Sequence, residues 1–524
     1  MNSSWTIKRR AFLAGSAAFS AAIGAGVAPR SAMAQAAPRR GGTLRLSVDQ
    51  AVAKLNPLLI RVNPEYLVAE LLYSGLTRLG TDMTPVPDLA ESWTPSPDLT
   101  EWTFKLRSGV VFHDGTPCTS ADVVASFEAM LDAKTASPAR NNIGPIDSVR
   151  ATGADAVVFK LKSSYADLPV MLAYTNARII PAAIATGALA RLDREAIGTG
   201  PFRLVSYEPD RQVVVQRNER YYDRARPYLD RIEIVIYPDP TAEGSALISG
   251  ATDLMMLTLP TEYARLRQAQ GVKVLRTPSG QFCNVNFGCD AAPFNDVRVR
   301  QALALCVDRA AMVDFVSEGY GTPGNDSALN SAYTYFVDQP MKKPDVAAAR
   351  KLLADAGHAQ GLKATLIASD RPAVRTQLAV ALREMSKPAG FDITVQTMPH
   401  ATYLDQVWKK GNFYIGFYNM QPTADGIFSL LYTSNATWNE TRWNNAAFDK
   451  AVFDARATIE PAKRRELYGQ AQAMMHRDVP SIIPVFFDLL AAQRSYVQGY
   501  NVHPRGAVFR LDYVSLGDGA PRRG

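Results

Sequence analysis

The chain has 524 residues, of which 47% are hydrophobic, 9% aromatic and 20% charged. Its length suits two to four domains, and its apolar content excludes a wholly disordered chain. The formal net charge of +7 suggests an anionic partner, but eight basic residues at the two ends account for it, and without them the balance is −1. We therefore expect no nucleic-acid partner.

Residues 1–34 have the order of a secretory signal. A basic head (Lys8-Arg9-Arg10) precedes a mild apolar stretch, and a small-x-small exit (Ala32-Met33-Ala34) follows it. The adjacent arginines before Phe12 are typical of a twin-arginine signal, which exports folded proteins. The alternative is an N-terminal membrane anchor, but the weakly apolar stretch argues against it. Because the first cysteine is Cys118, we expect a free periplasmic protein without a lipid anchor.

Strand and helix patterns alternate along the rest of the chain. Residues 41–48, 102–106 and 232–236 are predicted to form strands, the last two from their apolar alternation. Thr119 and Asp122 predict a capping box, followed by a helix with Val124, Phe127 and Leu131 on one face. One helix is predicted from Asp296 through Val299, Leu303, Cys306, Ala310 and Val313, and another over 345–356 that Gly357 ends. This alternation indicates a mixed α/β fold.

The search for catalytic or metal chemistry finds no motif. The histidines are His113, His358, His400, His476 and His503, and no two lie within four residues. Nucleophile elbows, phosphate loops and C-x-x-C pairs are absent from the sequence. We therefore expect no enzyme, no cofactor and no metal site, and we read His113 as a residue that forms local hydrogen bonds.

The four cysteines are Cys118, Cys283, Cys289 and Cys306. They are too sparse for a disulfide framework. Cys306 fits a buried free thiol, and Cys283 and Cys289 are too far apart along a strand to pair unless the chain turns between them. Pairing stays open at this stage.

Several segments in order carry a family resemblance. They are the L-A-x-S-W segment (Leu89–Trp93), the strand and turn Leu106–Pro117, the helix start Ala121-Asp122-Val123, Gly198–Phe202, Asn218–Tyr222, Ala246–Asp253, Asp296–Arg309, Asp345–Gly357 and Tyr468–Pro484. Together they resemble the family 5 extracellular solute-binding proteins, the dipeptide- and oligopeptide-binding proteins of ABC importers. The resemblance covers about residues 41–515.

The resemblance implies a fold and a set of partners. The fold is the two-lobed α/β type II periplasmic-binding-protein fold (cluster C-like), with a ligand cleft between the lobes. Lobe I is expected over 41–280 plus 485–515, and lobe II over 281–484. The implied partners are a small solute, expected to be a peptide, and the permease and ATPase of an ABC transporter. We expect a monomer.

The family's ligand contacts map onto one segment of lobe II, residues 416–425. In peptide-binding members this segment supplies an aspartate that pairs with the α-amino group of the ligand. Here the equivalent position is Met420, and the nearest carboxylate is Asp425. Either Asp425 takes over this role, or the ligand has no free α-amine, since a buried ammonium without a partner is costly.

Other candidates carry alternatives of their own. Phe417 and Tyr418 form an aromatic wall or belong to the lobe II core, with Asn419 next to them. Trp438 and Trp443 line the pocket or anchor the core. Arg375 binds a ligand carboxylate, or, as the more frequent case, is a solvated surface arginine. The exit of the first strand is expected to pair its main chain with the ligand at Asp49, Ala51 and Ala53.

Three functions follow from these expectations. The first is a periplasmic receptor for a peptide or peptide-like solute. The second keeps the fold but binds a nickel chelate, an opine, a glutathione-like or a sugar-derived solute, which Met420 favours. The third is a secreted hydrolase or chaperone.

Overall fold

The computed structural model describes residues 38–523, so the predicted signal segment 1–34 lies outside the described residues. One large sheet runs through the described chain in the order β15-β14-β16-β12-β17-β11-β1-β10-β9-β8, with β13 paired to β17. Its strands are β1 (Thr43–Val48), β8 (Phe202–Glu208), β9 (Gln212–Arg217), β10 (Arg231–Ile236), β11 (Leu254–Met255), β12 (Val272–Phe287), β13 (Gly321–Pro323), β14 (Leu362–Ser369), β15 (Phe391–Met398), β16 (Phe413–Tyr418) and β17 (Ser481–Arg494).

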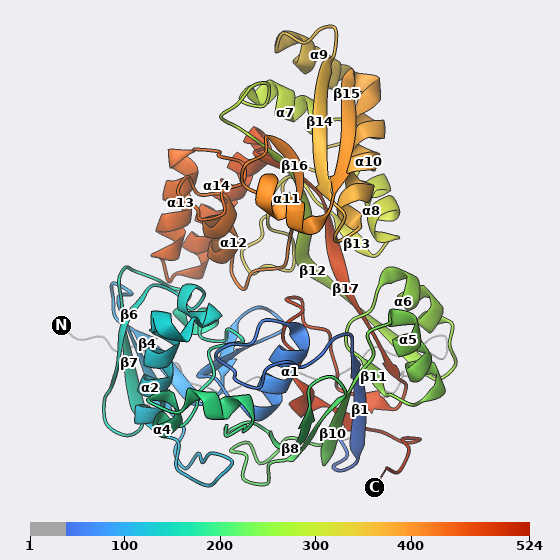
Figure 1. The fold of residues 1–524 in the computed structure, drawn as a ribbon. Coiled ribbons are helices and arrows are strands. Elements are labelled where there is room, and N and C mark those ends of the chain that lie inside the picture. Colours follow the sequence, from blue (N-terminus) through green and yellow to red (C-terminus); the bar gives the residue numbers. More distant parts are fainter. Residues whose placement is uncertain (1–37, 524) are drawn as a thin grey trace, which may run out of the picture. The chain divides into compact units, whose positions relative to one another are not determined.

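The long antiparallel pair β12 and β17 divides this sheet into two halves (Figure 1). The first half of β12 pairs with the last half of β17 next to β11, and its second half pairs with β16. We call the elements on the β11 side lobe I and those on the β16 side lobe II. The register of the pair shifts between Pro278 and Gln281. The lobe boundaries expected at 280 and 485 lie inside these two strands and stay a prediction.

Lobe I also carries a second sheet and six helices. The second sheet has the order β4 (Ala90–Pro95), β5 (Glu101–Leu106), β7 (Ala156–Leu161) and β6 (Ile146–Ala151). Two short pairs are β2 (Thr77–Leu79) with β3 (Pro85–Pro87), and β18 (Val497–Gln498) with β19 (Ser515–Leu516). The helices are α1 (Asn63–Leu72), α2 (Ser120–Leu131), α3 (Leu168–Met171), α4 (Ala182–Ala185), α5 (Pro240–Ser249) and α6 (Pro260–Arg267).

Lobe II carries β14, β15, β16 and eight helices (Figure 1). They are α7 (Val297–Ala304), α8 (Arg309–Ser317), α9 (Val346–Asp355), α10 (Val374–Ser386), α11 (His400–Gln406), α12 (Ala424–Leu431), α13 (Ala446–Arg456) and α14 (Pro461–Asp478). Each lobe has its own core, and a third apolar cluster joins Leu79, Met83 and Val508 of lobe I to Phe282 and Tyr333 of lobe II. The lobes therefore share packed surface beyond the two connecting strands.

The strands predicted at 41–48, 102–106 and 232–236 are confirmed as β1, β5 and β10, although β1 begins two residues later than predicted, at Thr43. The predicted capping box is also confirmed, because the Thr119 backbone N–H donates to the Asp122 carboxylate at 2.8 Å. The buried face of that helix is shifted by one residue: Val123, Phe127 and Met130 are buried, while Val124 and Leu131 are half-buried.

The single helix predicted from Asp296 to Val313 is wrong. The structure has two helices, α7 and α8, and the chain leaves the first at Leu305. The Asp308 carboxylate accepts from the backbone N–H groups of Ala310 and Ala311 at 3.1 and 3.0 Å, and so caps a new helix. The helix ended by Gly357 is confirmed, with that glycine at φ +93.

Candidate ligand-binding site

The segment expected to bind the ligand begins where β16 leaves the sheet. Along β16, Phe413, Ile415 and Phe417 pack on one face against α10, and Tyr414, Gly416 and Tyr418 lie on the other. Asn419 is exposed, and its Oδ1 accepts from Gln281 Nε2 of β12 at 2.6 Å.

Met420 turns inward rather than outward. Its side chain is 2% exposed, and the backbone N–H of Gly280 approaches Sδ at 3.3 Å. A Cβ at position 280 would lie 2.4 Å from the Tyr333 ring and 2.9 Å from Met420 Cγ, so this packing requires glycine. The Tyr333 hydroxyl accepts from the backbone N–H of Gln421 at 3.1 Å. The position of the family's aspartate is thus an apolar contact between the loop and β12.

Asp425 already has a partner within lobe II. It lies in the first turn of α12 and is 3% exposed, and its Oδ1 accepts from Ser429 Oγ and from Arg456 Nε, both at 2.9 Å. Burial raises the pKa of Asp425, and the Arg456 guanidinium opposes that rise. This carboxylate stabilises the contact between α12 and α13.

Of the aromatic candidates, Tyr418 and Trp443 are buried in a core cluster, while Phe417 and Trp438 are half-buried and packed against the core. Tyr418 is 8% exposed, and its hydroxyl accepts from Trp408 Nε1 at 3.2 Å. The half-buried Trp438 stacks edge-on against Trp408, with ring centroids 5.5 Å apart, and lies 6.2 Å from Tyr418. Trp443 is instead buried in the lobe II core against Phe448. Sequence reasoning missed Trp408, because no motif marks it.

Arg375 is not the solvated surface arginine that the sequence favoured. It lies in the first turn of α10, is 7% exposed, and no side-chain hydrogen bond or ion pair reaches it from residues 38–523. Its guanidinium carbon is 5.1 Å from the Tyr403 ring centroid and 6.0 Å from that of the half-buried Phe417. A buried guanidinium without a carboxylate is costly, which makes it a candidate for an anionic ligand group.

A buried carboxyl lies behind the other face of β16. Glu440 is 2% exposed, its Oε2 accepts from Asn286 Nδ2 at 2.6 Å, and its Oε1 has no hydrogen-bond partner among the described residues. Asn284 Nδ2 in turn donates to Asn286 Oδ1 at 2.6 Å. Burial raises the pKa of Glu440 to about 7. Its carboxylate fits the space over Gly416, where a Cβ would lie 3.0 Å from Oε2.

The exit of β1 supplies open main chain on lobe I. Asp49 and Ala53 are exposed, and Ala51 is half-buried. Between them, the Val52 backbone N–H donates to Pro209 O at 3.1 Å, and its carbonyl accepts from the Tyr207 hydroxyl at 2.7 Å. The bonds of Val52 hold the segment while Asp49 and Ala53 stay accessible.

The lobes are also tied together at a buried ion pair. Arg464 Nη2 of α14 donates to Asp167 Oδ1 of lobe I at 2.7 Å, and both side chains are 6% exposed. Next to it the Ala166 backbone N–H donates to Arg456 O at 2.9 Å. A cavity of about 220 Å³ adjoins the pair and is lined from both lobes by Trp93, Asp167, Tyr333, Tyr335, Thr423 and Arg464, among others.

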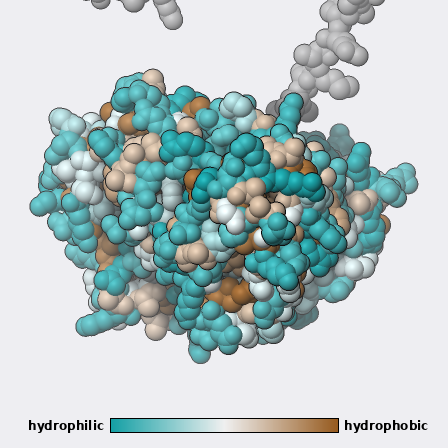
Figure 2. Space-filling view, turned by 90° about the horizontal axis from the view of Figure 1, so that it is seen from above, coloured by the Kyte–Doolittle hydropathy of each residue, from teal (hydrophilic) through white to brown (hydrophobic). Residues whose placement is uncertain are grey.

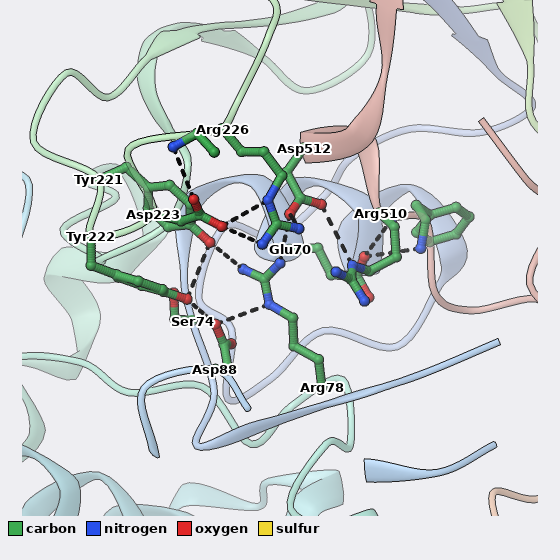
Figure 3. A network of polar contacts seen from close by, with 12 residues as sticks. Glu70, Ser74, Arg78, Asp88, Tyr221, Tyr222, Asp223, Arg226, Arg510 and Asp512 are labelled. Atoms are coloured by element: carbon green, nitrogen blue, oxygen red, sulfur yellow. Dashed lines mark hydrogen bonds and ion pairs between the residues drawn. The ribbon is translucent and has the colours of Figure 1, made fainter. Parts of the chain in front are cut away.

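A polar network in lobe I fixes the segment that follows β18 (Figure 3). Arg78 pairs with Asp88 through Nε and with Asp512 through Nη1, both at 2.9 Å. Arg226 and Arg510 lie 3.2 and 3.5 Å from Asp512. Burial would raise the pKa of Asp512, but Arg78, Arg510 and Arg226 outweigh it, so the pKa lies below its usual value. Sequence reasoning missed this network because its members lie far apart in the chain.

The remaining sequence expectations concern histidine and cysteine. The buried His113 ring lies 3.4 Å from Ala196 O and 3.2 Å from Gly200 O, so it holds the 196–200 turn. Cys118, Cys283, Cys289 and Cys306 are all free thiols. In the described part of the chain, no cluster of histidine, cysteine, aspartate and glutamate could hold a metal ion. No helix within residues 38–523 is long and apolar enough to cross a membrane.

The surface seen from above is mostly hydrophilic, with apolar side chains in small separate patches (Figure 2). The exposed large apolar residues lie on different elements, such as Leu259, Phe315 and Ile459.

Two α/β lobes on a shared strand pair define the class of two-lobed solute-binding proteins. The family described as "Bacterial extracellular solute-binding proteins, family 5 Middle" matches residues 84–441. The chain belongs to this family.

Similar proteins align with nearly the whole chain. The dipeptide-binding protein of Escherichia coli (strain K12) is 27% identical over 91% of this chain and 95% of its own. Heme-binding protein A of Haemophilus influenzae is 28% identical over 91% of this chain and 92% of its own. The solved structure of AgaA of A. tumefaciens R10 in complex with agropinic acid is 25% identical, with a TM-score of 0.74, and covers 91% of this chain and 99% of that one.

Proposed function

We propose that this protein captures a small solute of the peptide or peptide-like class between its lobes and delivers it to the permease and ATPase of an ABC transporter. The observation that carries the proposal is Arg375, whose buried guanidinium has no hydrogen-bond or ion-pair partner in the described part of the chain and lies beside Phe417, where the family's ligand segment begins. A ligand carboxylate at this arginine would offset the cost of its burial.

The same segment favours a solute without a free α-amine. Met420 is packed against Gly280 and Tyr333, and Asp425 is paired with Arg456. Neither offers a carboxylate to an ammonium group. A blocked peptide, or a non-peptide acid such as an opine, leaves no ammonium unpaired, and similar proteins are named for dipeptide, heme and agropinic acid.

Export to the periplasm through residues 1–34 belongs to the same proposal. The basic head, the apolar stretch and the Ala32-Met33-Ala34 exit support a cleaved twin-arginine signal. A monomer fits a receptor that closes around its solute and then docks on a permease, since closure is driven by the difference in affinity between the two states.

The decisive experiment is a thermal-shift panel on the mature protein, with mass spectrometry of co-purified small molecules. The panel pairs free-amine di- to pentapeptides with their N-acetyl forms and adds glutathione, heme and agropinic acid. A true ligand at 100 times its Kd adds about 2.7 kcal/mol to the free energy of unfolding. N-acetyl forms should stabilise the protein at least as well as free-amine forms.

The variant Arg375→Gln should lose most of this stabilisation, while Arg150→Gln, an exposed arginine on β6, should keep it. Stabilisation by free-amine peptides alone would refute the argument from Met420 and Asp425. Turnover of a stabilising peptide would instead favour a secreted hydrolase.

A further inference from the structure

A cavity of about 1150 Å³ in lobe I adjoins the polar network around Arg78 (Figure 3). Its lining comes mainly from the hairpin of β2 and β3, the loop between β9 and β10 and the segment that follows β18. Within the described chain, all of its lining residues belong to lobe I, and neither residues 416–425 nor residues 49–53 are among them. The cavity is therefore separate from the candidate site for the solute.

One part of this lining is held in place by its own hydrogen bonds. Arg78 Nη2 donates to the Tyr221 hydroxyl at 2.7 Å, and that hydroxyl donates to the Tyr222 hydroxyl at 3.1 Å. The Tyr222 hydroxyl donates in turn to Asp88, whose side chain is fully buried (Figure 3). Arg78 also pairs with Asp88 and Asp512, so its charge is compensated inside the protein. A ligand would meet this part of the cavity as a fixed wall without a free charge.

Three other arginines of the lining keep free guanidinium N–H groups. Arg107 donates only from Nε, to Asp88 O at 2.6 Å, and Arg224 donates only from Nη1, to Glu219 O at 2.7 Å. Neither of them forms an ion pair within residues 38–523. Arg510 Nε lies 3.5 Å from Asp512 Oδ1 without a hydrogen bond, and its Nη groups donate to no residue of the described chain. These N–H groups remain available to an anion.

The carboxylates of the lining do not compensate these arginines. Asp88 is buried in the wall, and Asp223 Oδ2 accepts from Arg226 Nε at 2.8 Å. Asp82 is exposed, and its Oδ1 accepts from the Thr84 backbone N–H and hydroxyl at 3.1 and 2.7 Å. The charge that a ligand can reach is therefore three guanidinium groups against one exposed carboxylate, which makes the cavity locally positive.

Tyrosine rings lie beside the same arginines. Tyr513 is 42% exposed, and its ring centroid lies 4.1 Å from the guanidinium carbon of Arg226 and 4.6 Å from that of Arg510. The guanidinium carbon of Arg107 lies 5.5 Å from the Tyr222 ring centroid. Tyrosine and arginine are enriched among the residues that dominate protein interfaces. The cavity thus offers apolar contact next to its positive groups.

We propose that this cavity is a docking site on lobe I for an acidic peptide segment of a partner protein. Arg107, Arg224 and Arg510 bind carboxylates of the segment, and Tyr513 contacts an apolar side chain between them. The site goes beyond the proposed function and does not depend on the class of the solute. Because its lining belongs to one lobe, docking does not require the lobes to close.

The size and charge of the cavity favour a peptide over other anions. Its volume exceeds the range of about 300–1000 Å³ that is typical of small-molecule pockets. The chain without its basic ends has a charge balance of −1, so it has no extended positive field for a nucleic acid or an anionic membrane. Three guanidinium groups in one cavity instead match a short segment with two or three carboxylates.

The test measures binding of hexaglutamate, hexalysine, citrate and hexathymidylate to the mature protein by calorimetry. The wild type should bind hexaglutamate and not hexalysine, and added salt should weaken the binding. Arg107→Gln and Arg510→Gln should each lower the affinity for hexaglutamate by about 10- to 100-fold, because charge-assisted hydrogen bonds are lost. Arg224→Gln should lower it by about two- to fivefold, since this arginine is exposed.

Arg150→Gln is the matched control, and Arg375→Gln separates this cavity from the solute site; both should bind hexaglutamate as the wild type does. No binding of hexaglutamate, or its loss in Arg375→Gln alone, would overturn the docking site and leave the proposed function intact. Tighter binding of citrate or hexathymidylate than of hexaglutamate would assign the cavity to a free polycarboxylate or to a phosphate ligand, and would also overturn it. Should Arg510→Gln not fold, Arg107→Gln and Arg224→Gln decide by the same comparison.

Discussion

The buried carboxyl of Glu440 makes the stability of lobe II depend on pH. Its burial raises its pKa to about 7 from an ordinary 4.5. The folded state therefore holds a proton that the unfolded state releases between these two values. Glu440 therefore makes its full contribution to the free energy of unfolding below pH 4.5, and this contribution is lost as the pH rises through 7. The difference between the folded and unfolded pKa values corresponds to about 3 kcal/mol of unfolding free energy.

The variant Glu440→Gln removes this titration and keeps the shape of the side chain. A glutamine can still accept from Asn286, and its amide needs no charge at high pH. We expect the variant to match or fall below the wild type at pH 4.5, and to gain on it by about 3 kcal/mol on going to pH 8.

Urea unfolding at half-unit pH steps measures the difference between the two proteins, so other titrating groups cancel. Glu466→Gln, on the exposed side of α14, controls for the chemical change. A difference between wild type and Glu440→Gln that stays constant from pH 4.5 to 8 would show that Glu440 does not titrate in this window, and would refute the argument from burial.

Three further predictions follow from other contacts. Asp425→Asn should leave the affinity for any free-amine peptide unchanged, as measured by calorimetry. It should lower the free energy of unfolding in urea by about 3 kcal/mol, because Arg456 loses its carboxylate partner. A large loss of affinity would restore Asp425 as an amine anchor. Asp167→Asn should lower the free energy of unfolding by about 4 kcal/mol, because it leaves the buried Arg464 without an opposite charge. Adding Arg464→Met should recover part of this loss, as measured by urea unfolding. An Asp167→Asn protein as stable as the wild type would contradict this prediction. Burial lowers the pKa of His503 to about 4, so its contribution to stability is present above pH 6.5 and falls by about 3 kcal/mol as the pH drops to 4; His503→Gln should flatten that part of the profile, and an equal slope in both proteins would contradict the assignment.

Local patterns predicted much of the fold. Period-two alternation predicted β1, β5 and β10, and Thr119 with Asp122 predicted the start of α2, because these signals act within a few residues. The merged helix at 296–313 shows the limit of such patterns: apolar spacing continued across Leu305–Asp308, but the Asp308 side chain capped a second helix.

By itself, the sequence determined the family, because ordered motifs persist along the chain, and it predicted that residues 416–425 bind the ligand. It also placed Met420 at the position of the expected carboxylate. The tertiary structure decided which side chains are available there. Asp425 is paired with Arg456, and Arg375 is buried without a hydrogen-bond or ion-pair partner for its side chain among residues 38–523. The physical reason is that the energy of a charge depends on its desolvation and its partners, and these come from residues distant in the chain.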